Sequence, residues 1–317
     1  MTNSVADCDI TPLDQLERCP RIVTIGTFDG VHRGHQELLA RTVARAGERG
    51  MPSLALTFEP PPAMVLRPDR FPGRICSTEI KLKRLAASGI NELTVLPFDR
   101  ALSQQTPEDF MAYIATATGL RELWVGEAFA LGRNRVGNVT RLGEIGRDLG
   151  FEVVAMPRVT IDDDVVSSSA IRNAIIGGDA ERARTYLGRP FHISGEVIHG
   201  AHLGRTIGFP TANVVPPDWL VPLADGIYAS IAALPNEGGR WPAMTYIGTR
   251  PTVNSGERQI ETNLFDFAGD LYGQTIDVEF YARLRGDAVF AGLKELIAQL
   301  HRDEQAARAI LFRESPG

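Results

Sequence analysis

The pattern of apolar residues changes once along this chain, near Gly188, and the change separates two regions of different fold class. From residue 21 to about 186, short apolar runs alternate with helical patterns. Such alternation predicts a Rossmann-like, doubly wound α/β domain with a parallel sheet. From residue 190 to about 284, many short β-like runs lie between turns rich in Gly and Pro, which predicts an antiparallel barrel or sandwich. We therefore expect two domains, at residues 1–186 and 187–317.

The expected strands of the first region are short and rich in Val, Ile and Leu, as strands covered on both faces should be. They are Ile22–Ile25, Leu54–Thr57, Leu93–Leu96, Leu123–Val125 and Val153–Met156. Helices are expected to begin near Gly34, at Ser77 and at Thr106. The expected strands of the second region are His192–Val197, Gly226–Ala232, Met244–Ile247, Glu261–Phe265 and Thr275–Phe280, and an amphipathic helix follows from about Ala288 to Leu311.

Charge and composition exclude several classes of protein. The formal net charge is −6, so the basic footprint of a nucleic-acid groove is absent. No stretch of about 18 apolar residues occurs, and we expect no membrane span. Cys8, Cys19 and Cys76 form no CxxC pair, which favours a reducing compartment with neither a disulfide framework nor a zinc site. The N-terminal segment lacks the apolar core of a signal peptide, so we expect a cytoplasmic protein.

A glycine-rich turn follows the first expected strand and opens the first helix. It reads Gly26-Thr27-Phe28-Asp29-Gly30-Val31-His32-Arg33-Gly34-His35. Open α/β sheets bind ligands at the carboxyl ends of their strands, and the N–H groups of a helix start attract phosphate. His32 and His35 lie on neighbouring helical positions and are suited to hydrogen-bond an α-phosphate whose charge grows during displacement. The simpler alternative is a glycine turn with two surface histidines.

A run of serines stands just past the last strand of the same domain, in Ser167-Ser168-Ser169-Ala170-Ile171-Arg172. Hydroxyls at a helix start are ordinarily capping residues. The alternative is that Arg172 faces the same ligand as the histidines and grips an outgoing pyrophosphate.

The second region opens with a strand, a glycine-rich loop and an extended Pro-Thr-Ala-Asn segment, within residues 195–213. Successive backbone N–H groups in such a loop form a concave anion site. Thr211 and Asn213 offer hard oxygen ligands that suit Mg²⁺. The GxxxxGK[ST] pattern of a P-loop is absent. On composition alone, a barrel with a glycine-rich hairpin explains these residues equally well.

The first two motifs closely resemble the HxGH and SSTxIR motifs of the nucleotidylyltransferase superfamily. In detail, residues 26–35 are similar to the adenylyltransferase module of bacterial bifunctional riboflavin kinase/FMN adenylyltransferases, also called FAD synthetases. The resemblance implies that His32 and His35 stabilise the α-phosphate of ATP and that Ser168 and Arg172 hold its phosphates. It also implies direct attack of the FMN phosphate on ATP, with no covalent intermediate.

The motifs after residue 190 resemble the riboflavin kinase module in order and spacing. They are the loop and PTAN segment, Asp225-Gly226-Ile227-Tyr228, Ile247-Gly248-Thr249-Arg250-Pro251-Thr252, the strand around Glu261, and Leu271-Tyr272-Gly273. The resemblance implies a six-stranded antiparallel barrel with a C-terminal helix. It also implies that Glu261 is the general base for the ribityl hydroxyl of riboflavin, a role that a carboxylate can fill. Taken alone, Glu261 is better explained as a solvated strand carboxylate.

The resemblance yields a set of candidate site residues. Glu261, His32 and His35 are the candidate catalytic residues. Thr211 and Asn213 are the candidate Mg²⁺ ligands. The candidate nucleotide-binding residues are Gly26, Phe28, Asp29, Gly34, Ser168, Ser169, Arg172, Gly204, Arg205, Gly208, Thr211 and Asn213.

Two segments depart from the pattern of the adenylyltransferase module. Pro61 stands where the family usually has a histidine, in Phe58-Glu59-Pro60-Pro61-Pro62, and Ala128 replaces a polar residue in the segment 126–132. Losing one hydrogen bond to a charged ligand group costs roughly 1.5–3 kcal/mol. These departures raise the alternative of an enzyme that is a riboflavin kinase only.

The leading hypothesis is an ATP-using, two-site transferase that converts riboflavin to FMN and FMN to FAD. Its expected ligands are riboflavin, FMN, ATP and Mg²⁺, and we expect no nucleic acid or membrane partner. We expect a monomer or a transient homo-oligomer. The rival hypotheses are a kinase with a degenerate or altered first domain, and a non-catalytic flavin-binding protein.

Overall fold

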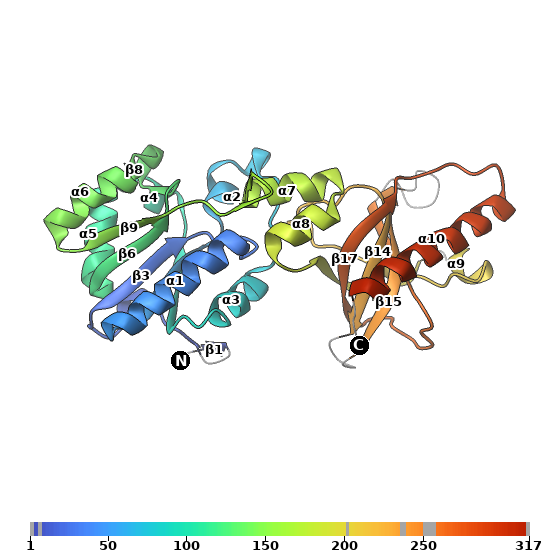
Figure 1. Cartoon of the computed structure of the whole chain (residues 1–317), viewed down its shortest axis with the longest axis horizontal. Coiled ribbons are helices and arrows are strands. Elements are labelled where there is room, and N and C mark those ends of the chain that lie inside the picture. The colour runs from blue at the N-terminus through green and yellow to red at the C-terminus, as the bar shows by residue number, and fades with distance from the viewer. Residues whose placement is uncertain (1–2, 6–7, 201–202, 235–238, 250–257, 315–317) are drawn as a thin grey trace. The chain divides into compact units, whose positions relative to one another are not determined.

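The computed structural model describes residues 3–5, 8–200, 203–234, 239–249 and 258–314 (Figure 1). The chain divides into two compact units, Met1–Ser168 and Ser169–Gly317. Two short helices, α7 (Ser168–Gly177) and α8 (Ala180–Leu187), therefore group almost entirely with the second unit. The domain boundary between residues 186 and 187 stays a prediction.

The first unit is built on a seven-stranded sheet in the order β1-β2-β5-β4-β3-β6-β9. Neighbouring strands from β2 to β9 are parallel, and β1 is antiparallel to β2. The predicted parallel sheet is thus confirmed, with the two N-terminal strands as an addition. The bounds are β1 Asn3–Val5, β2 Cys8–Ile10, β3 Arg21–Gly26, β4 Ser53–Glu59, β5 Glu92–Pro97, β6 Leu120–Gly126 and β9 Glu152–Met156.

Two helices of the first unit begin where the sequence predicted their capping residues. Ser77 accepts a hydrogen bond from the Ile80 N–H (3.1 Å), and Thr106 accepts one from the Asp109 N–H (3.1 Å). The helices are α1 Arg33–Arg49, α2 Pro62–Leu66, α3 Thr78–Ala86, α4 Arg100–Ser103, α5 Pro107–Thr118 and α6 Val139–Leu149. Short 3-10 turns (Leu13–Gln15, Pro68–Arg70 and Arg133–Arg135) and two small hairpins complete the unit: β7 Ala130–Leu131 with β8 Gly137–Asn138, and β10 Thr160–Ile161 with β11 Asp164–Val165.

Apolar side chains bury both faces of this sheet. Val23 and Leu123 pack in one cluster with Phe110 and Ile114 of α5. Leu93 packs on the other face, in a cluster that includes residues of α1 and α3. The near-continuous apolar runs of the central strands reflect this double coverage, because their side chains are buried on both faces of the sheet.

The amino end of the sheet is held by a buried arginine. The Arg21 side chain is fully buried, and its guanidinium donates to both carboxylate oxygens of Glu92 at 2.5 and 2.7 Å. It also donates to the carbonyl oxygens of Glu17 (2.6 Å) and Thr118 (3.1 Å). A buried charge is tolerated because it is paired and hydrogen-bonded in this way.

The second unit contains a closed antiparallel barrel in the order β12-β13-β16-β15-β14-β17. This confirms the six-stranded barrel that the resemblance implies. The strands are β12 Phe191–Ile198, β13 Ala212–Val214, β14 Gly226–Leu234, β15 Gly239–Thr249, β16 Arg258–Leu264 and β17 Thr275–Arg285, and the remaining helices are α9 Leu203–Thr206 and α10 Leu293–Glu314.

The terminal helix begins later than the sequence pattern predicts. We expected it from about Ala288, but α10 starts at Leu293. Gly292 accounts for the difference, because glycine disfavours the helix interior and here provides the carbonyl that accepts the first helical hydrogen bond, from Leu296 (3.2 Å). Glu295 reaches back to the Ala291 N–H (2.9 Å), which satisfies a free donor at the helix start.

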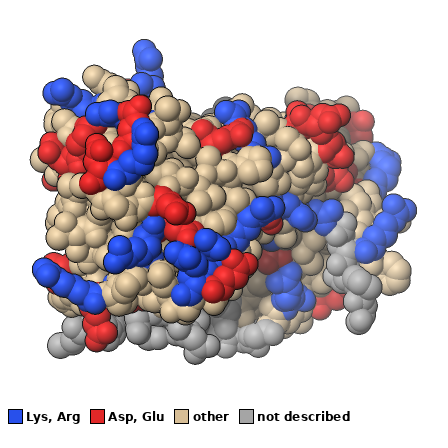
Figure 2. All heavy atoms as spheres, turned by 60° about the vertical axis from the view of Figure 1, so that its left-hand side comes forward, with Lys and Arg blue, Asp and Glu red and all other residues tan. Residues whose placement is uncertain are grey.

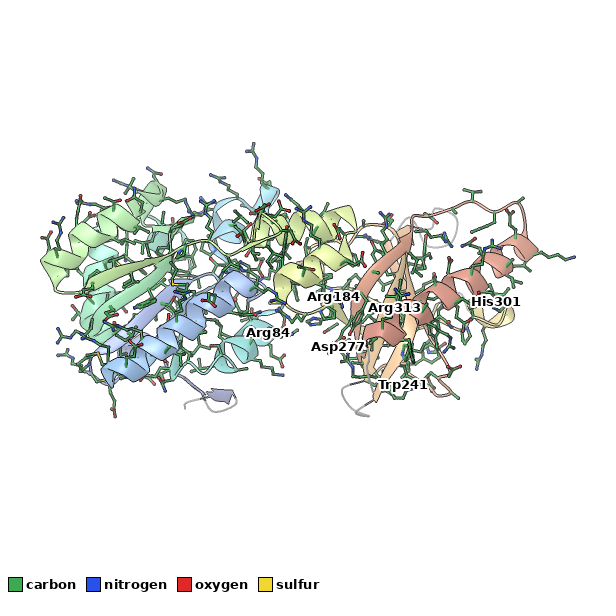
Figure 3. The ribbon with its side chains drawn as sticks, in the orientation of Figure 1. Arg84, Arg184, Trp241, Asp277, His301 and Arg313 are labelled. Carbon is green, nitrogen blue, oxygen red and sulfur yellow. The ribbon has the colours of Figure 1, made fainter. Side chains whose placement is uncertain are left out.

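Helices cover the barrel through aromatic and ionic contacts. The Arg184 guanidinium of α8 lies over the Tyr281 ring, 5.6 Å from its centroid, and His301 of α10 meets the Phe209 ring edge to face at 5.0 Å (Figure 3). Arg285 of β17 pairs with the buried Asp303 of α10 at 2.8 Å. Within the described residues, no helix combines the length and apolar character needed to cross a membrane.

Candidate functional site

The turn between β3 and α1 has an unusual backbone. Phe28 (φ 50°), Gly30 (φ 78°) and Val31 (φ 40°) all occupy positive φ, which is uncommon for residues other than glycine. Phe28 and Val31 are buried in the apolar cluster beneath α1, so packing compensates the backbone strain. The turn thus delivers the chain to the start of α1 at the carboxyl end of a parallel strand, the position that the sequence predicted for a ligand site.

The two histidines of this turn lie against one another. His32 caps α1, with its Nδ1 accepting from the His35 N–H at 3.4 Å. The two rings stack with centroids 3.6 Å apart and 19° between their planes, and Phe28 meets His35 edge to face at 5.2 Å. Phe28, predicted to bind nucleotide, therefore contributes a buried ring that supports His35.

The environment keeps His35 neutral. Burial lowers the pKa of His35 well below its ordinary value of 6.5, and the adjacent His32 lowers it further. The buried His35 Nδ1 has no hydrogen-bond partner among the described residues. Buried polar atoms are normally paired, so this nitrogen is a group to which a ligand could hydrogen-bond.

Asp29 and Ser168 brace the same turn. The buried Asp29 carboxylate accepts the Ile75 N–H at 3.1 and 3.3 Å, and the Ser168 hydroxyl donates to the Asp29 carbonyl oxygen at 3.1 Å. Gly26 ends β3 and Gly34 is the second residue of α1, so both lie in the turn as predicted. Ser169 and Arg172 lie in α7, within the second compact unit.

The two departing segments flank β3 at the same end of the sheet. Pro61 is buried and follows β4, whereas Ala128 is exposed in the turn that follows β6. Strands β4 and β6 are the two neighbours of β3. The carboxyl ends of these parallel strands share one edge, so both substitutions lie at the edge that bears the histidines.

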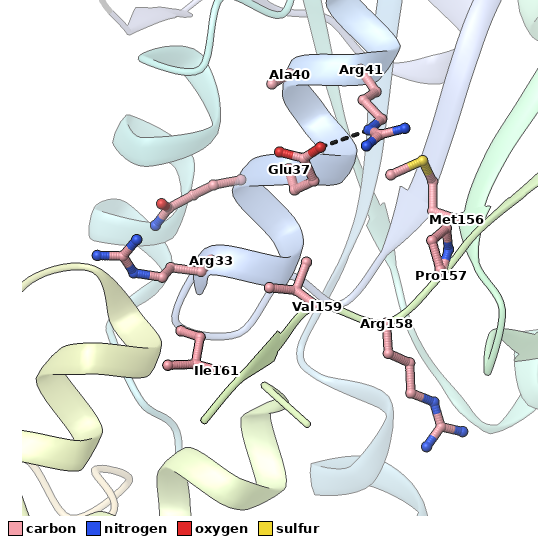
Figure 4. Close-up of a pocket in the computed structure, with 10 residues that line it drawn as sticks. Arg33, Glu37, Ala40, Arg41, Met156, Pro157, Arg158, Val159 and Ile161 are labelled. Carbon is pink, nitrogen blue, oxygen red and sulfur yellow. Dashed lines mark hydrogen bonds and ion pairs between the residues drawn. The ribbon is translucent and has the colours of Figure 1, made fainter. Parts of the chain in front are cut away.

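An open pocket of about 540 Å³ lies beside the histidine turn (Figure 4). Arg33 and Gln36 of α1 line one side, and the segment from Met156 to Ile161 lines the other. Further along α1, Arg41 pairs with Glu37 at 2.6 Å. The lining thus combines apolar side chains and arginines next to the predicted phosphate site. Charged side chains of both signs also lie close together elsewhere on the surface, as one face of the molecule shows (Figure 2).

The second candidate site is a polar row across three strands of the barrel. Asn213 of β13 is paired with Glu261 of β16, and Glu261 is paired with Tyr246 of β15. Side chains of directly opposed residues in antiparallel strands lie on the same face. All three are half-buried, whereas the alternate residues Thr245 and Thr262 are fully buried inside the barrel. The structure thus brings together two residues that lie far apart in sequence and were both predicted for this site.

The glycine-rich loop approaches this row closely. A Cβ at Gly200 would collide with the Asn213 side-chain amide, and one at Gly204 would collide with the Phe209 carbonyl oxygen. The Phe209 N–H closes the loop onto the Gly204 carbonyl at 2.8 Å. The glycines therefore let the backbone lie directly over the PTAN segment. Arg205 is exposed in α9, and Gly208 follows with φ 86°.

Sequence reasoning missed one buried polar contact beside this row. Asn263, with 7% of its surface exposed, donates its Nδ2 to the Pro210 carbonyl oxygen at 2.6 Å. The signal in the sequence was the period of two in β16, which places Asn263 on the face of Glu261. Arg250, Pro251 and Thr252, which also belong to the predicted motif set, lie outside the described residues.

Comparisons with known proteins place similar sequences on both regions. The FAD synthetase family model matches residues 14–170, and the riboflavin kinase family model matches residues 187–311. The bifunctional riboflavin kinase/FMN adenylyltransferase of Pseudomonas fluorescens is 40% identical, covering 91% of this chain and 92% of the relative. That of Escherichia coli K12 is 37% identical, covering 97% and 99%. A crystal structure from Streptococcus pneumoniae, described as a macrolide-efflux protein, is 30% identical with a TM-score of 0.84 over 94% of this chain and 97% of that one.

Proposed function

This chain belongs to the family of bifunctional riboflavin kinase/FMN adenylyltransferases, and from that premise we propose that it makes both flavin nucleotides. Its barrel unit phosphorylates riboflavin to FMN, with ATP as phosphate donor. Its first unit adenylylates FMN to FAD and releases pyrophosphate.

One observation carries this proposal. Each family model falls on a separate set of motifs: the FAD synthetase match contains the turn with the stacked histidines, and the riboflavin kinase match contains the row with Asn213 and Glu261. Both sets keep the polar side chains that their chemistry requires. A non-catalytic flavin-binding protein does not need stacked imidazoles or a half-buried strand carboxylate, so this arrangement favours two working sites.

The barrel site supports transfer of the γ-phosphoryl group of ATP. In our proposal the Glu261 carboxylate accepts the proton of the ribityl 5′-hydroxyl while that oxygen attacks the γ-phosphorus. The bond from the γ-phosphorus to the β,γ-bridging oxygen breaks, and ADP leaves. An aliphatic alcohol is a poor nucleophile, so a positioned base makes the attack feasible. The backbone of the glycine-rich loop, with Gly204, Arg205 and Gly208, would hold the ATP phosphates.

Thr211 and Asn213 fit a magnesium ion. Their side chains supply neutral, hard oxygens, and they stand two residues apart, with Asn213 in β13 and Thr211 just before it. Mg²⁺ commonly keeps several waters and takes further ligands from substrate phosphates, so two protein oxygens are a suitable set. When bound, the ion neutralises charge that develops on the transferring phosphoryl group.

The histidine turn supports transfer of the adenylyl group. The FMN phosphate attacks the α-phosphorus of ATP, and the imidazoles of His32 and His35 donate hydrogen bonds to the α-phosphate oxygens. The start of α1 adds N–H groups and the positive end of the helix dipole. Ser168, Ser169 and Arg172 are proposed to hold the β- and γ-phosphates that leave as pyrophosphate.

The pocket next to this turn is proposed to hold the nucleoside part of ATP. Its volume of about 540 Å³ falls in the usual range for small-molecule sites, and it borders Arg33, the neighbour of His32. Met156 and Ile161 give it apolar walls against which an adenine ring can lie.

Product analysis tests the proposal. The protein is incubated with riboflavin, ATP and Mg²⁺, and the flavins are separated by chromatography. We expect FMN to appear first and FAD to follow. A reaction that stops at FMN, even with FMN and other nucleotides supplied, would favour a kinase-only enzyme, the alternative that Pro61 and Ala128 raise. The cytoplasmic location and the monomeric or transiently oligomeric state remain predictions.

A further inference from the structure

The segment that carries Thr211 is held to the barrel by a side-chain hydrogen bond next to the regular strand pairing. The regular pairing of β13 with β16 covers three residue pairs, from Val214 opposite Ile260 to Ala212 opposite Thr262. Thr211 lies just before this pairing begins. Pro210, which precedes it, has no N–H and cannot extend the strand by donating a backbone hydrogen bond.

A side chain bonds the carbonyl group of this proline instead. Asn263 follows Thr262 in β16, and its buried amide donates to the Pro210 carbonyl oxygen at 2.6 Å. Asn263 and Glu261 stand two residues apart in one strand, so they share a face of the barrel. One strand thus provides both the proposed base and the anchor of the peptide that precedes Thr211.

A second hydrogen bond joins this segment to a different part of the second unit. The Phe209 N–H bonds to the Gly204 carbonyl at 2.8 Å, which ties the segment to the glycine-rich loop. That loop does not belong to β16. Among the described residues, the Asn263 bond therefore adds to the pairing of Ala212 with Thr262 and holds the peptide before Thr211 to the strand that carries Glu261.

We propose that Asn263 is a positioning residue for riboflavin phosphorylation, which holds Thr211 at its working distance from Glu261. The inference rests on the proposed kinase activity of the barrel. It assigns Asn263 no contact with substrate, so its effect on the reaction passes through Thr211.

The first test is the variant Asn263→Leu, which keeps a buried side chain of similar size and removes the donor. At saturating riboflavin, kcat/KM for MgATP in FMN formation should fall about 10- to 100-fold, because small displacements of positioning groups have effects of this size. The KM for riboflavin should stay within about twofold, and adenylylation of supplied FMN should not change. If Asn263→Leu does not fold, Asn263→Ala removes the same donor without adding a charge and carries the same expectations.

Two further variants separate positioning from general stability. Ser230→Ala removes a buried hydrogen bond of the same barrel, Ser230 to Thr245 at 2.7 Å, and should leave FMN formation at the wild-type rate. Asn263→His restores an N–H close to the position of the amide nitrogen and should recover most of the lost activity.

The decisive comparison is a double-mutant cycle with Thr211→Val. If Asn263 acts through Thr211, Asn263→Leu should reduce kcat/KM little further once Thr211 is replaced. Fully multiplicative losses in the double variant, or wild-type kinetics in Asn263→Leu, would overturn the inference. A wild-type protein that forms no FMN at all would instead overturn the proposed function.

Discussion

The two candidate sites are built in different ways. In the first unit, the two histidines sit on a strained turn and a helix start, so residues close together in the sequence bring them into contact. In the barrel, Asn213 and Glu261 meet because two strands are paired, although 47 positions lie between them in the sequence. The first arrangement depends on local backbone geometry, whereas the second depends on the register of the whole barrel. Variants should therefore affect the two reactions separately and for different reasons.

The largest expected effect separates the reactions at the barrel. Glu261→Gln removes the proposed base but keeps the size of the side chain, and FMN formation should fall roughly 10²–10⁴-fold. Adenylylation of supplied FMN should remain at the wild-type rate. Both rates are measured by chromatography of flavins under initial-rate conditions.

A matched control is Glu279→Gln, which alters another strand carboxylate of the same barrel, one that pairs with Arg240 at 2.6 Å. It should leave both reactions unchanged. Equal losses of FMN formation in Glu261→Gln and Glu279→Gln would show that Glu261 has only a structural role.

The reciprocal effect is expected at the histidine turn. His32→Asn removes an imidazole, while asparagine remains a good helix cap for α1. FAD formation from FMN should fall about 10²–10³-fold, the usual cost of losing one group that stabilises developing charge. FMN formation from riboflavin should not change.

The control for capping is Ser77→Ala, which removes the cap of α3 in the same unit. It should lower stability without a comparable loss of FAD formation. Loss of both reactions in His32→Asn would contradict the separation of the sites.

A third expected effect concerns stability of the first unit. Arg21→Met leaves the Glu92 carboxylate without its main partner at the amino end of the sheet, far along β3 from the histidines. The cost should be about 3 kcal/mol, at the low end for a broken buried pair, because the Glu92 side chain is 23% exposed. Urea unfolding measures it, and the folded variant should keep its FAD-forming activity at 25 °C.

The outcome that would contradict this view of Arg21 is unchanged urea stability together with reduced FAD formation. That result would link the amino end of the sheet to the reaction at its carboxyl end.

The smallest expected effect is a pH dependence from His35. Its pKa lies well below 6.5 in the folded chain, so the unfolded chain binds a proton first as the pH falls. The stability that His35 contributes is therefore complete above about pH 6.5 and is lost at lower pH, by at most about 1.4 kcal/mol per pH unit. His35→Gln should remove this loss, as measured by urea unfolding at several pH values. An identical acid-side slope in wild type and variant would show that His35 is not held neutral.

The sequence predicted the site of the first unit more fully than that of the barrel. Capping residues, apolar strands and the glycine turn are local signals, so Ser77, Thr106 and the histidine turn could be placed before the structure was known. The stacking of the two rings and the depressed pKa of His35 depend on burial, which the sequence does not show.

The barrel was predicted mainly through resemblance to a known module. Strand order and register arise from pairing across the chain, and no local pattern predicts that Glu261 faces Asn213. The Asn263 contact was missed for the same reason, because it joins β16 to a proline outside the regular pairing. The start of α10 was predicted too early, because the amphipathic pattern begins before Gly292 but the helical backbone begins only after it.

The central claim is that the substrates bound in the two sites attack two different phosphorus atoms of ATP. Isotopic labelling tests this claim most directly. The protein is given riboflavin and Mg²⁺ with ATP labelled at either the α- or the γ-phosphorus. We predict γ-label in FMN and both labels in FAD, with His32→Asn accumulating γ-labelled FMN and Glu261→Gln forming neither product from riboflavin. FMN that carries the α-label, or FAD formation that survives loss of both side chains, would contradict the account.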